Sequence, residues 1–153
     1  MEEKQAETSR QAQKLIPLII DTNILFSCLL GKSLAIRETL FSSHDVKPYS
    51  CKFAIVELFK HKDKLLKCSG LEEDEMLELF YYLMTKIEFY NENTISDTSL
   101  QKAYELCRDI DEKDTVLVGL TIELNGLLWT GDKQLAKGLK QKGFRQLYKK
   151  TYV

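Results

Sequence analysis

Four acidic residues stand where they could do chemistry on a ligand. Asp21 and Asp132 each come directly after an apolar run that has the composition of a buried strand. Asp114 opens an expected helix, and Glu57 lies among apolar residues early in a long helix. An acid in such an apolar context usually has a partner, because an isolated buried charge is costly. The set of four predicts a site that no single acid would establish.

Clustered carboxylates of this kind favour a divalent cation. The carboxyl ends of parallel strands share one edge of a sheet, so Asp21 and Asp132 would converge there if their strands are neighbours. Two carboxylates about 4 Å apart repel each other by about 4 kcal/mol at an effective dielectric of 20. Protons or a cation must offset this repulsion, and all-oxygen ligands select Mg²⁺ or Mn²⁺. Such an ion can acidify a bound water and neutralise a phosphate oxygen, which is the basis of metal-assisted phosphodiester hydrolysis.

Each acid also has an ordinary structural explanation. Helix capping would account for Asp21, Asp114 and Asp132. A solvated helix position or an ion pair with Lys60 would account for Glu57. Asp111 fits either a turn or capping residue or a peripheral metal ligand. The prediction of a metal site therefore depends on all four acids coming together.

Alternating strands and helices must position these acids. The expected strands are 16–21, 46–51, 87–90, 127–130 and 144–148, and the expected helices are 22–30, 34–41, 53–67, 71–85, 97–108, 114–124 and 133–141. This alternation predicts an α/β fold with three layers, in which helices flank a central, mostly parallel sheet. Pro48 predicts that strand 46–51 is not a central one. Ser33 and either Ser96 or Asp97 are expected helix caps.

Length and composition indicate an ordinary globular protein. The 153 residues suit a polar leader over residues 1–14 and a single domain over residues 15–153. A net charge of -1 argues against a strongly electrostatic nucleic-acid binder but allows a local basic patch. Four cysteines without a C-x-x-C pair, and no signal peptide, predict reduced thiols in a cytoplasmic protein. No apolar run is long enough to cross a membrane.

Four blocks of sequence, in order and in matching elements, resemble the PIN domain family. The blocks are Asp21-Thr22-Asn23 after an apolar strand, Glu57 in Val-Glu-Leu-Phe-Lys-His, Asp111-x-x-Asp114-Thr115 with Gly119-Leu120, and Trp129-Thr130-Gly131-Asp132-Lys133. The chain is similar in particular to a bacterial and archaeal branch of predicted nucleic-acid-binding PIN proteins. The resemblance covers residues 18–148. One departure is Thr115-Val116, where many relatives have smaller or more apolar residues.

The resemblance implies a metal-dependent ribonuclease. Such a ribonuclease could serve as the toxin of a toxin–antitoxin pair. Asp21, Glu57, Asp114 and Asp132 would form the acidic quartet that holds Mg²⁺ or Mn²⁺. Asn23 would orient Asp21 or support the site through a hydrogen bond, and Thr130 would fill the polar position before the last acid. The expected products carry 5′-phosphate and 3′-hydroxyl ends. The implied partner is RNA. Family members that serve as toxins often pair with an antitoxin protein, and family members often form homodimers, but the motifs carry over neither property.

Basic side chains must draw RNA past the acids. Lys113 and Lys133 are the better candidates because each adjoins one of the acids, and Lys60 lies beyond Glu57. For most lysines of the C-terminal segment, Lys142 among them, a solvated position is the simpler explanation. Trp129 is expected in the core rather than as a platform for base stacking.

Three other classes of protein compete with this interpretation. A catalytically silent nucleic-acid- or protein-binding module on the same fold is the main alternative, and the four intact acids argue against it. A phosphoryl-receiving signalling domain would leave Glu57 and Asp114 unexplained. A haloacid-dehalogenase-type phosphatase needs Asp-x-Asp after its first strand, and Asn23 stands where its second Asp should be.

Overall fold

The computed structural model describes residues 14–31 and 33–149. The expected leader, residues 1–14, lies outside this part of the chain except for Lys14. In order, the elements are β1 (Ile16–Ile20), α2 (Thr22–Leu30), α3 (Leu34–Ser42), β2 (Val46–Cys51), α4 (Phe53–Lys60), α5 (Lys62–Ser69), α6 (Glu73–Lys86), β3 (Glu88–Tyr90), the 3₁₀ turn η1 (Glu92–Thr94), α7 (Asp97–Cys107), the 3₁₀ turn η2 (Glu112–Asp114), α8 (Thr115–Glu123), β4 (Leu127–Trp129) and α9 (Lys133–Gln141).

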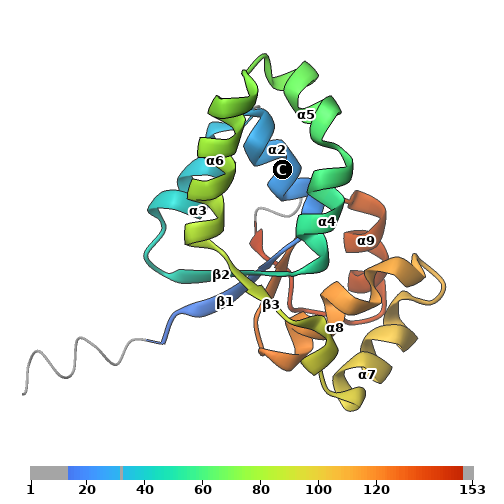
Figure 1. Ribbon diagram of the computed structural model, residues 1–153. Helices are drawn as coiled ribbons and strands as arrows, with labels where there is room; N and C mark the ends of the chain where they lie inside the picture. Colours follow the sequence, from blue (N-terminus) through green and yellow to red (C-terminus); the bar gives the residue numbers. More distant parts are fainter. Residues whose placement is uncertain (1–13, 32, 150–153) are drawn as a thin grey trace, which may run out of the picture.

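A four-stranded sheet forms the middle layer of the fold (Figure 1). Its strand order is β3-β2-β1-β4, and all three pairings are parallel. β1 is an inner strand and pairs with β2 through Ile16–Ile19 and with β4 through Leu18–Ile20. The order places the carboxyl ends of β1 and β4 side by side, as the convergence of Asp21 and Asp132 requires.

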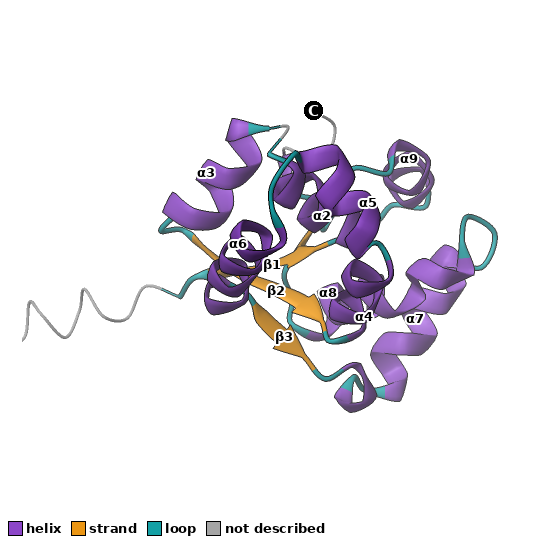
Figure 2. Cartoon of the chain, turned by 45° about the horizontal axis from the view of Figure 1, so that its top comes forward, coloured by secondary structure: helices purple, strands orange, loops and turns teal. Residues whose placement is uncertain are grey.

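Helices cover both faces of the sheet, which confirms the predicted three-layer α/β/α fold (Figure 2). Successive side chains of β1 alternate between two hydrophobic cores. Leu18 and Ile20 pack into the core formed with α2 to α6. Ile19 packs into the other core, formed with α7, α8 and α9. All three side chains are fully buried, so the strand that leads to Asp21 is anchored from both sides.

The prediction that strand 46–51 is not central was wrong. β2 lies between β3 and β1, although it contains Pro48. The stagger of the sheet explains how the proline is accommodated. β2 pairs with β1 through Val46–Tyr49 and with β3 only through Tyr49–Cys51, so Pro48 adjoins a single partner strand. The missing N–H of Pro48 therefore leaves no gap in a two-sided ladder.

Two other elements are shorter than expected. The predicted helix 53–67 breaks at His61, whose φ of -102° and ψ of 17° are not helical, and α4 and α5 form in its place. The predicted strand 144–148 reduces to one parallel bridge between Leu128 and Leu147. β4 has only three residues. On the side of β4 that faces away from β1, the N–H of Leu128 donates to the Gln146 carbonyl, and the carbonyl of Leu128 accepts from the Tyr148 N–H.

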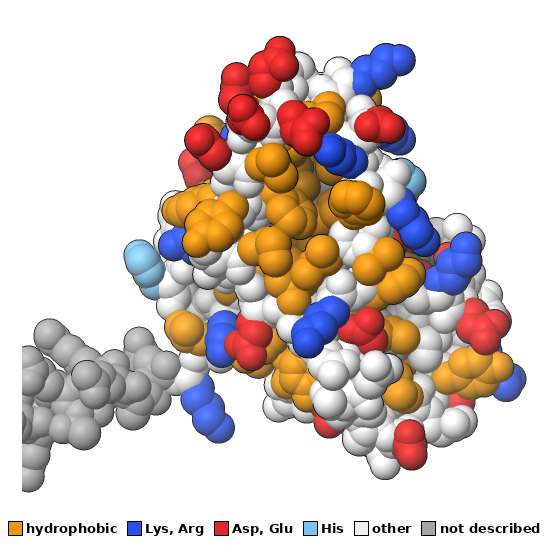
Figure 3. All heavy atoms as spheres, viewed as in Figure 1, with side chains coloured by type: hydrophobic (Ala, Val, Ile, Leu, Met, Phe, Trp, Pro, Cys, Tyr) orange, Lys and Arg blue, Asp and Glu red, His pale blue; other side chains and the backbone are white. Residues whose placement is uncertain are grey.

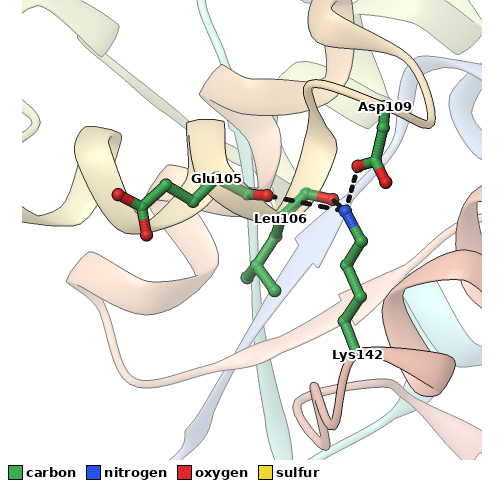
Figure 4. Close-up of polar contacts among 4 residues, drawn as sticks. All are labelled: Glu105, Leu106, Asp109 and Lys142. Carbon is green, nitrogen blue, oxygen red and sulfur yellow. Dashed lines mark hydrogen bonds and ion pairs between the residues drawn. The ribbon is translucent and has the colours of Figure 1, made fainter.

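Side chains close the ends of several helices. Ser33 and Ser96 are the caps of α3 and α7, as predicted, and each hydroxyl accepts from a backbone N–H three residues later. At the other end of α7, the ammonium group of Lys142 donates to the carbonyl oxygens of Glu105 and Leu106 and pairs with Asp109 (Figure 4). These bonds satisfy carbonyls that the helix itself leaves open. Lys142 therefore has a structural role in addition to its exposed position.

The remaining expectations from composition concern cysteines and membranes. All four cysteines are free thiols, and three of them are buried, whereas Cys68 on α5 is exposed. Trp129 is 2% exposed and lies in the core, as expected. Within residues 14–31 and 33–149, no helix has both the length and the apolar character needed to cross a bilayer.

Candidate active site

The candidate site lies at the carboxyl edge of the sheet, where β1 and β4 end. The N–H of Asp21 donates to the Trp129 carbonyl at 3.0 Å, which extends the β1–β4 ladder to the first acid. Asp132 follows β4 after two residues. The two acids predicted to converge are therefore carried by neighbouring strands that are bonded up to the point where the side chains leave the sheet.

Thr130 ties these two strand ends together through its side chain. Its hydroxyl donates to Asp21 Oδ2 at 2.6 Å and accepts from the N–H of Asp132 at 3.1 Å. Thr130 is fully buried. The sequence predicted a polar residue at this position, and the contacts give it a specific role: one hydroxyl fixes both the Asp21 carboxylate and the backbone that carries Asp132.

Asp21 occupies the N-cap position of α2, yet its side chain makes no capping hydrogen bond. Burial raises the pKa of Asp21, and the nearby charge of Asp132 adds to that rise. The hydrogen bond from Thr130 and the nearby polar N–H groups of Asn23 and Thr22 act in the opposite direction. The capping explanation therefore does not account for this carboxylate, which is held at the strand end by Thr130.

Asn23 supports the loop of Asp132 rather than Asp21 itself. Its side-chain oxygen accepts from the N–H of Gly131 at 3.2 Å. Asp132 Oδ1 accepts from the N–H of Leu135 at 3.1 Å and caps α9, so the capping explanation is correct for this acid. The cap uses one carboxylate oxygen and fixes the orientation of the other.

Glu57 reaches the site from α4, across the edge of the sheet. The hydroxyl of Thr22 donates to Glu57 Oε1 at 3.3 Å. Thr22 directly follows Asp21 in the chain, so this bond joins the second acid to the end of β1. Spacing alone offered no sign of this contact, because 35 residues separate its partners.

Asp114 shows the strongest electrostatic effect in the group. The pKa of Asp114 is raised to about 7, first by burial and then by the charges of Asp21, Asp111, Asp132 and Glu57, in that order. Its Oδ2 atom is buried and has no hydrogen-bond partner. All the predicted acids thus lie within electrostatic reach of Asp114.

The oxygen atoms of these acids suit a hard cation, but the carboxylates do not surround a common point. Every candidate ligand is an oxygen, and the buried Oδ2 of Asp114 has a free lone pair. However, in the part of the chain that the structure describes, no three His, Cys, Asp or Glu side chains come close enough together to hold a metal ion. Side-chain movement would have to bring the acids into coordination distance.

The secondary candidates lie at the periphery. Asp111 accepts from the N–H of Lys113 at 3.0 Å at the start of η2, which agrees with a turn or capping residue. Lys113 and Lys133 are exposed beside Asp114 and Asp132. Lys60 is exposed at the end of α4, with its Nζ 5.9 Å from the centre of the Phe53 ring. A role for the three lysines in RNA binding stays a prediction.

Glu92 is an acid that the sequence analysis did not single out. It begins η1, two residues after β3, and its Oε2 atom is buried without a hydrogen-bond partner. The pKa of the Cys51 thiol at the end of β2 is raised to about 12, first by burial and then by the charges of Glu92 and Glu57. The signal in the sequence was its place after a strand, the same one that identified Asp21.

Replacing Thr130 with valine tests its role in holding Asp21. Thr130→Val keeps the side-chain shape but removes the hydroxyl that donates to Asp21 Oδ2. Without a bond that stabilises the charged form, the pKa of Asp21 should rise further. The loss of this buried hydrogen bond should also lower the free energy of unfolding by about 1–3 kcal/mol. Carboxyl titration by NMR and urea unfolding measure the two effects.

Thr130→Ser is the matched control, because it keeps the hydroxyl and should leave the pKa of Asp21 near its original value. An unchanged Asp21 pKa in Thr130→Val would show that the hydroxyl does not control this carboxylate.

Comparison with known proteins assigns the chain to a family. No curated protein matched the chain. A family model described as PIN domain matches residues 19–151, which includes the end of β1, all of β4 and all four acids of the candidate site. The match covers most of the chain and agrees with the parallel sheet between two helical layers. The chain belongs to the PIN domain family.

Proposed function

We propose that this chain is a metal-dependent endoribonuclease whose acidic quartet is Asp21, Glu57, Asp114 and Asp132. The family supports a nuclease-type fold. The observation that carries the proposal is the state of Asp114, whose pKa of about 7 reflects burial among four other acids. A fold that gathers negative charge around a buried carboxylate favours binding of a cation there.

The four acids have different supports, which suggest different roles. Thr130 holds Asp21 and Thr22 holds Glu57, so these two carboxylates have fixed orientations. Asp132 is held through the cap of α9. Asp114 has a free buried oxygen and would be the acid most changed by an ion. Mg²⁺ or Mn²⁺ bound here would supply positive charge for the scissile phosphate and acidify a water.

The chain's own residues would then guide the RNA. Lys113 and Lys133 adjoin Asp114 and Asp132 and are exposed, so their ammonium groups can contact phosphates on either side of the cleaved bond. Lys60 would extend this contact along α4. Because these contacts are with phosphates, they would give affinity that falls with salt rather than recognition of a base sequence.

A catalytically silent binding module is the second candidate. The open spacing of the acids favours it, because no three His, Cys, Asp or Glu side chains among the described residues are arranged to hold a metal ion. Such a module would bind RNA without cleaving it and would not respond to Mg²⁺ or Mn²⁺. The two candidates therefore differ in a single assay.

A toxin role stays a prediction. It expects a small reading frame for an antitoxin beside the gene, and growth arrest when the chain is expressed without that partner. The same nuclease chemistry would serve a nuclease that has no antitoxin. Gene order and a growth assay with the wild-type chain separate these two roles.

Cleavage of a fluorescent single-stranded RNA tests the proposed function. With Mg²⁺ or Mn²⁺ we expect products with 5′-phosphate and 3′-hydroxyl ends, and excess chelator should stop the reaction. A matched RNA with structured hairpins would define the preferred substrate. RNA that is bound and not cleaved in any metal would establish the silent module, and cleavage undiminished by chelator would contradict the metal-dependent mechanism.

A further inference from the structure

Two flat rings lie on either side of Glu57 along α4. Phe53 begins this helix, one turn before Glu57, and His61 follows its last residue, one turn after Glu57. Residues four apart in the chain are neighbours on one face of a helix. Phe53, Glu57 and His61 therefore form a single row, here called the α4 row, in which an acid of the candidate site stands between the two rings.

Both rings of the α4 row are open to solvent. Phe53 is 51% exposed, and the side chain of His61 is exposed as well. An aromatic ring that is buried to this small extent adds little to the stability of a core, because stabilisation follows the apolar area removed from water. Each ring can therefore offer a face to a ligand that reaches Glu57.

Helix α2 fixes the position of the His61 ring relative to the candidate site. The Thr22 hydroxyl bonds to Glu57 Oε1, and one turn further along both helices the Phe26 ring meets the His61 ring. The ring centres are 6.1 Å apart and the planes are at 90°, which is the favourable edge-to-face arrangement. Phe26 is half-buried and so supports the exposed ring of His61, about one helical turn of 5.4 Å from Glu57.

A lysine accompanies the ring at each end of the α4 row. Lys60 Nζ lies 5.9 Å from the centre of the Phe53 ring, and Lys64 Nζ lies 5.6 Å from the centre of the Phe26 ring. Both lysines are exposed, and basic side chains lie beside apolar ones where α4 and α5 run (Figure 3). An exposed cation–π contact is weak, so each ammonium group can leave its ring for a phosphate. Rings interleaved with cations are the surface that binds single-stranded nucleic acid.

We propose that the α4 row is a stacking platform, on which the two nucleobases that flank the cleaved bond of an RNA strand lie against the rings of Phe53 and His61. The inference rests on the proposed nuclease function, because it places the cleaved phosphate beside Glu57, between the two rings. Phe and His rings stack on RNA bases that have left their own stack. Lys60 and Lys64 contact the adjoining phosphates.

The platform would give the site a preference that contacts with phosphates cannot supply. Lysine–phosphate contacts position a strand without reading its bases. Stacking on Phe53 and His61 requires bases whose faces are free, which an intact duplex does not offer. Every base has a face that can stack, so the platform tolerates different sequences. It therefore favours unpaired segments of RNA over paired ones without selecting a particular base.

Fluorescence anisotropy with a short labelled single-stranded RNA, in excess chelator, tests the platform without cleavage. Phe53→Leu and His61→Leu keep an apolar side chain but remove the ring, and each should weaken binding by about 5-fold or more. Phe53→Tyr and His61→Tyr restore a ring and should bind as wild type does. The salt dependence of binding should be unchanged in Phe53→Leu, because no charge is lost. Tyr104→Leu is the matched control, because Tyr104 is an exposed ring on α7, outside the α4 row.

RNAs that each lack one base identify the stacked positions. In wild type, removal of a base should weaken binding at two positions, and these should flank the bond that is cleaved in Mg²⁺ or Mn²⁺. The loss at one position should vanish in Phe53→Leu and the loss at the other in His61→Leu, because a contact that is already absent cannot be lost again. Circular dichroism confirms that each variant is folded.

The outcomes separate the platform from the proposed function. If wild type binds or cleaves RNA and the affinity is the same in Phe53→Leu and His61→Leu, the platform is overturned and the nuclease proposal stands. Base-removal losses that persist in both variants also overturn the platform. If the expected losses appear but no metal supports cleavage, the rings do stack on RNA and the nuclease proposal fails. A chain that neither binds nor cleaves RNA overturns both.

Discussion

Asp21→Asn should lower the rate of RNA cleavage by roughly 10³-fold while the fold survives. A metal ion contributes several kcal/mol to such a reaction, and each 1.36 kcal/mol corresponds to a factor of ten in rate. Asp21 is the acid most directly tied to the sheet, through its backbone bond to Trp129 and its side-chain bond to Thr130. The substitution removes one negative charge and keeps the side-chain shape. Single-turnover cleavage at saturating Mg²⁺ measures the loss.

The fold should tolerate this change because the asparagine oxygen can still accept from Thr130. Removing one charge from the acidic group should also leave the metal-free melting temperature unchanged or raise it. Asp97→Asn is the matched control, since Asp97 is exposed on α7 and should keep full activity. Full activity of Asp21→Asn would contradict the metal–carboxylate mechanism, and a clear fall in its melting temperature would give Asp21 a structural role.

Asp114→Asn should stabilise the metal-free protein at neutral pH and above. The pKa of Asp114 is about 7 in the folded protein, against an ordinary value of 3.8. The folded state therefore holds this proton more tightly than the unfolded state does. Below about pH 4 the carboxyl is protonated in both states and carries no penalty. As the pH rises from about 4 to about 7, ionisation increasingly destabilises the folded state of wild type.

The difference between wild type and Asp114→Asn isolates this effect from all other titrations. We expect about 1–2 kcal/mol of stabilisation at pH 8 after allowing for solvent screening of a half-buried group, and almost none at pH 4. That corresponds to a rise in melting temperature of about 3–6 °C for a chain of this size. Thermal unfolding in chelator across this pH range measures it. If the melting temperatures of both proteins depended on pH in the same way, ionisation of Asp114 would not destabilise the folded state.

The order of the elements could be predicted from the sequence because each strand can be recognised from its own short segment of residues. The run Leu18–Ile20 is apolar on both faces, and it proved to be an inner strand with two buried sides. Ser33 and Ser96 marked the starts of α3 and α7 through their capping chemistry. What failed was the inference from Pro48, because the position of a strand in a sheet depends on stagger between strands, which no local pattern encodes.

In the candidate site, too, local features could be predicted from the sequence and contacts between distant residues could not. Asp21, Asp114 and Asp132 could be predicted because each is an acid at the end of a strand or at the start of a helix. Glu57 could be predicted because its neighbours in the sequence are apolar. The bonds that hold them link residues far apart in the chain, such as Thr22 with Glu57 and Thr130 with Asp21. Only the packing of β1 beside β4 creates the second of these bonds. Glu92 was missed because its loop looked like an ordinary polar turn.

Titration of the metal-free chain with Mn²⁺ by calorimetry at pH 7.5 tests the central claim most directly, because it needs neither substrate nor turnover. The acidic quartet predicts saturable binding of Mn²⁺ to wild type. The affinity should be at least about 10-fold to 100-fold lower in Asp21→Asn and in Asp114→Asn, because the loss of even a supporting partner of a metal ligand lowers metal affinity by that factor. Asp97→Asn should bind as wild type does. Absence of saturable binding, or equal affinity in wild type and both quartet variants, would contradict the account.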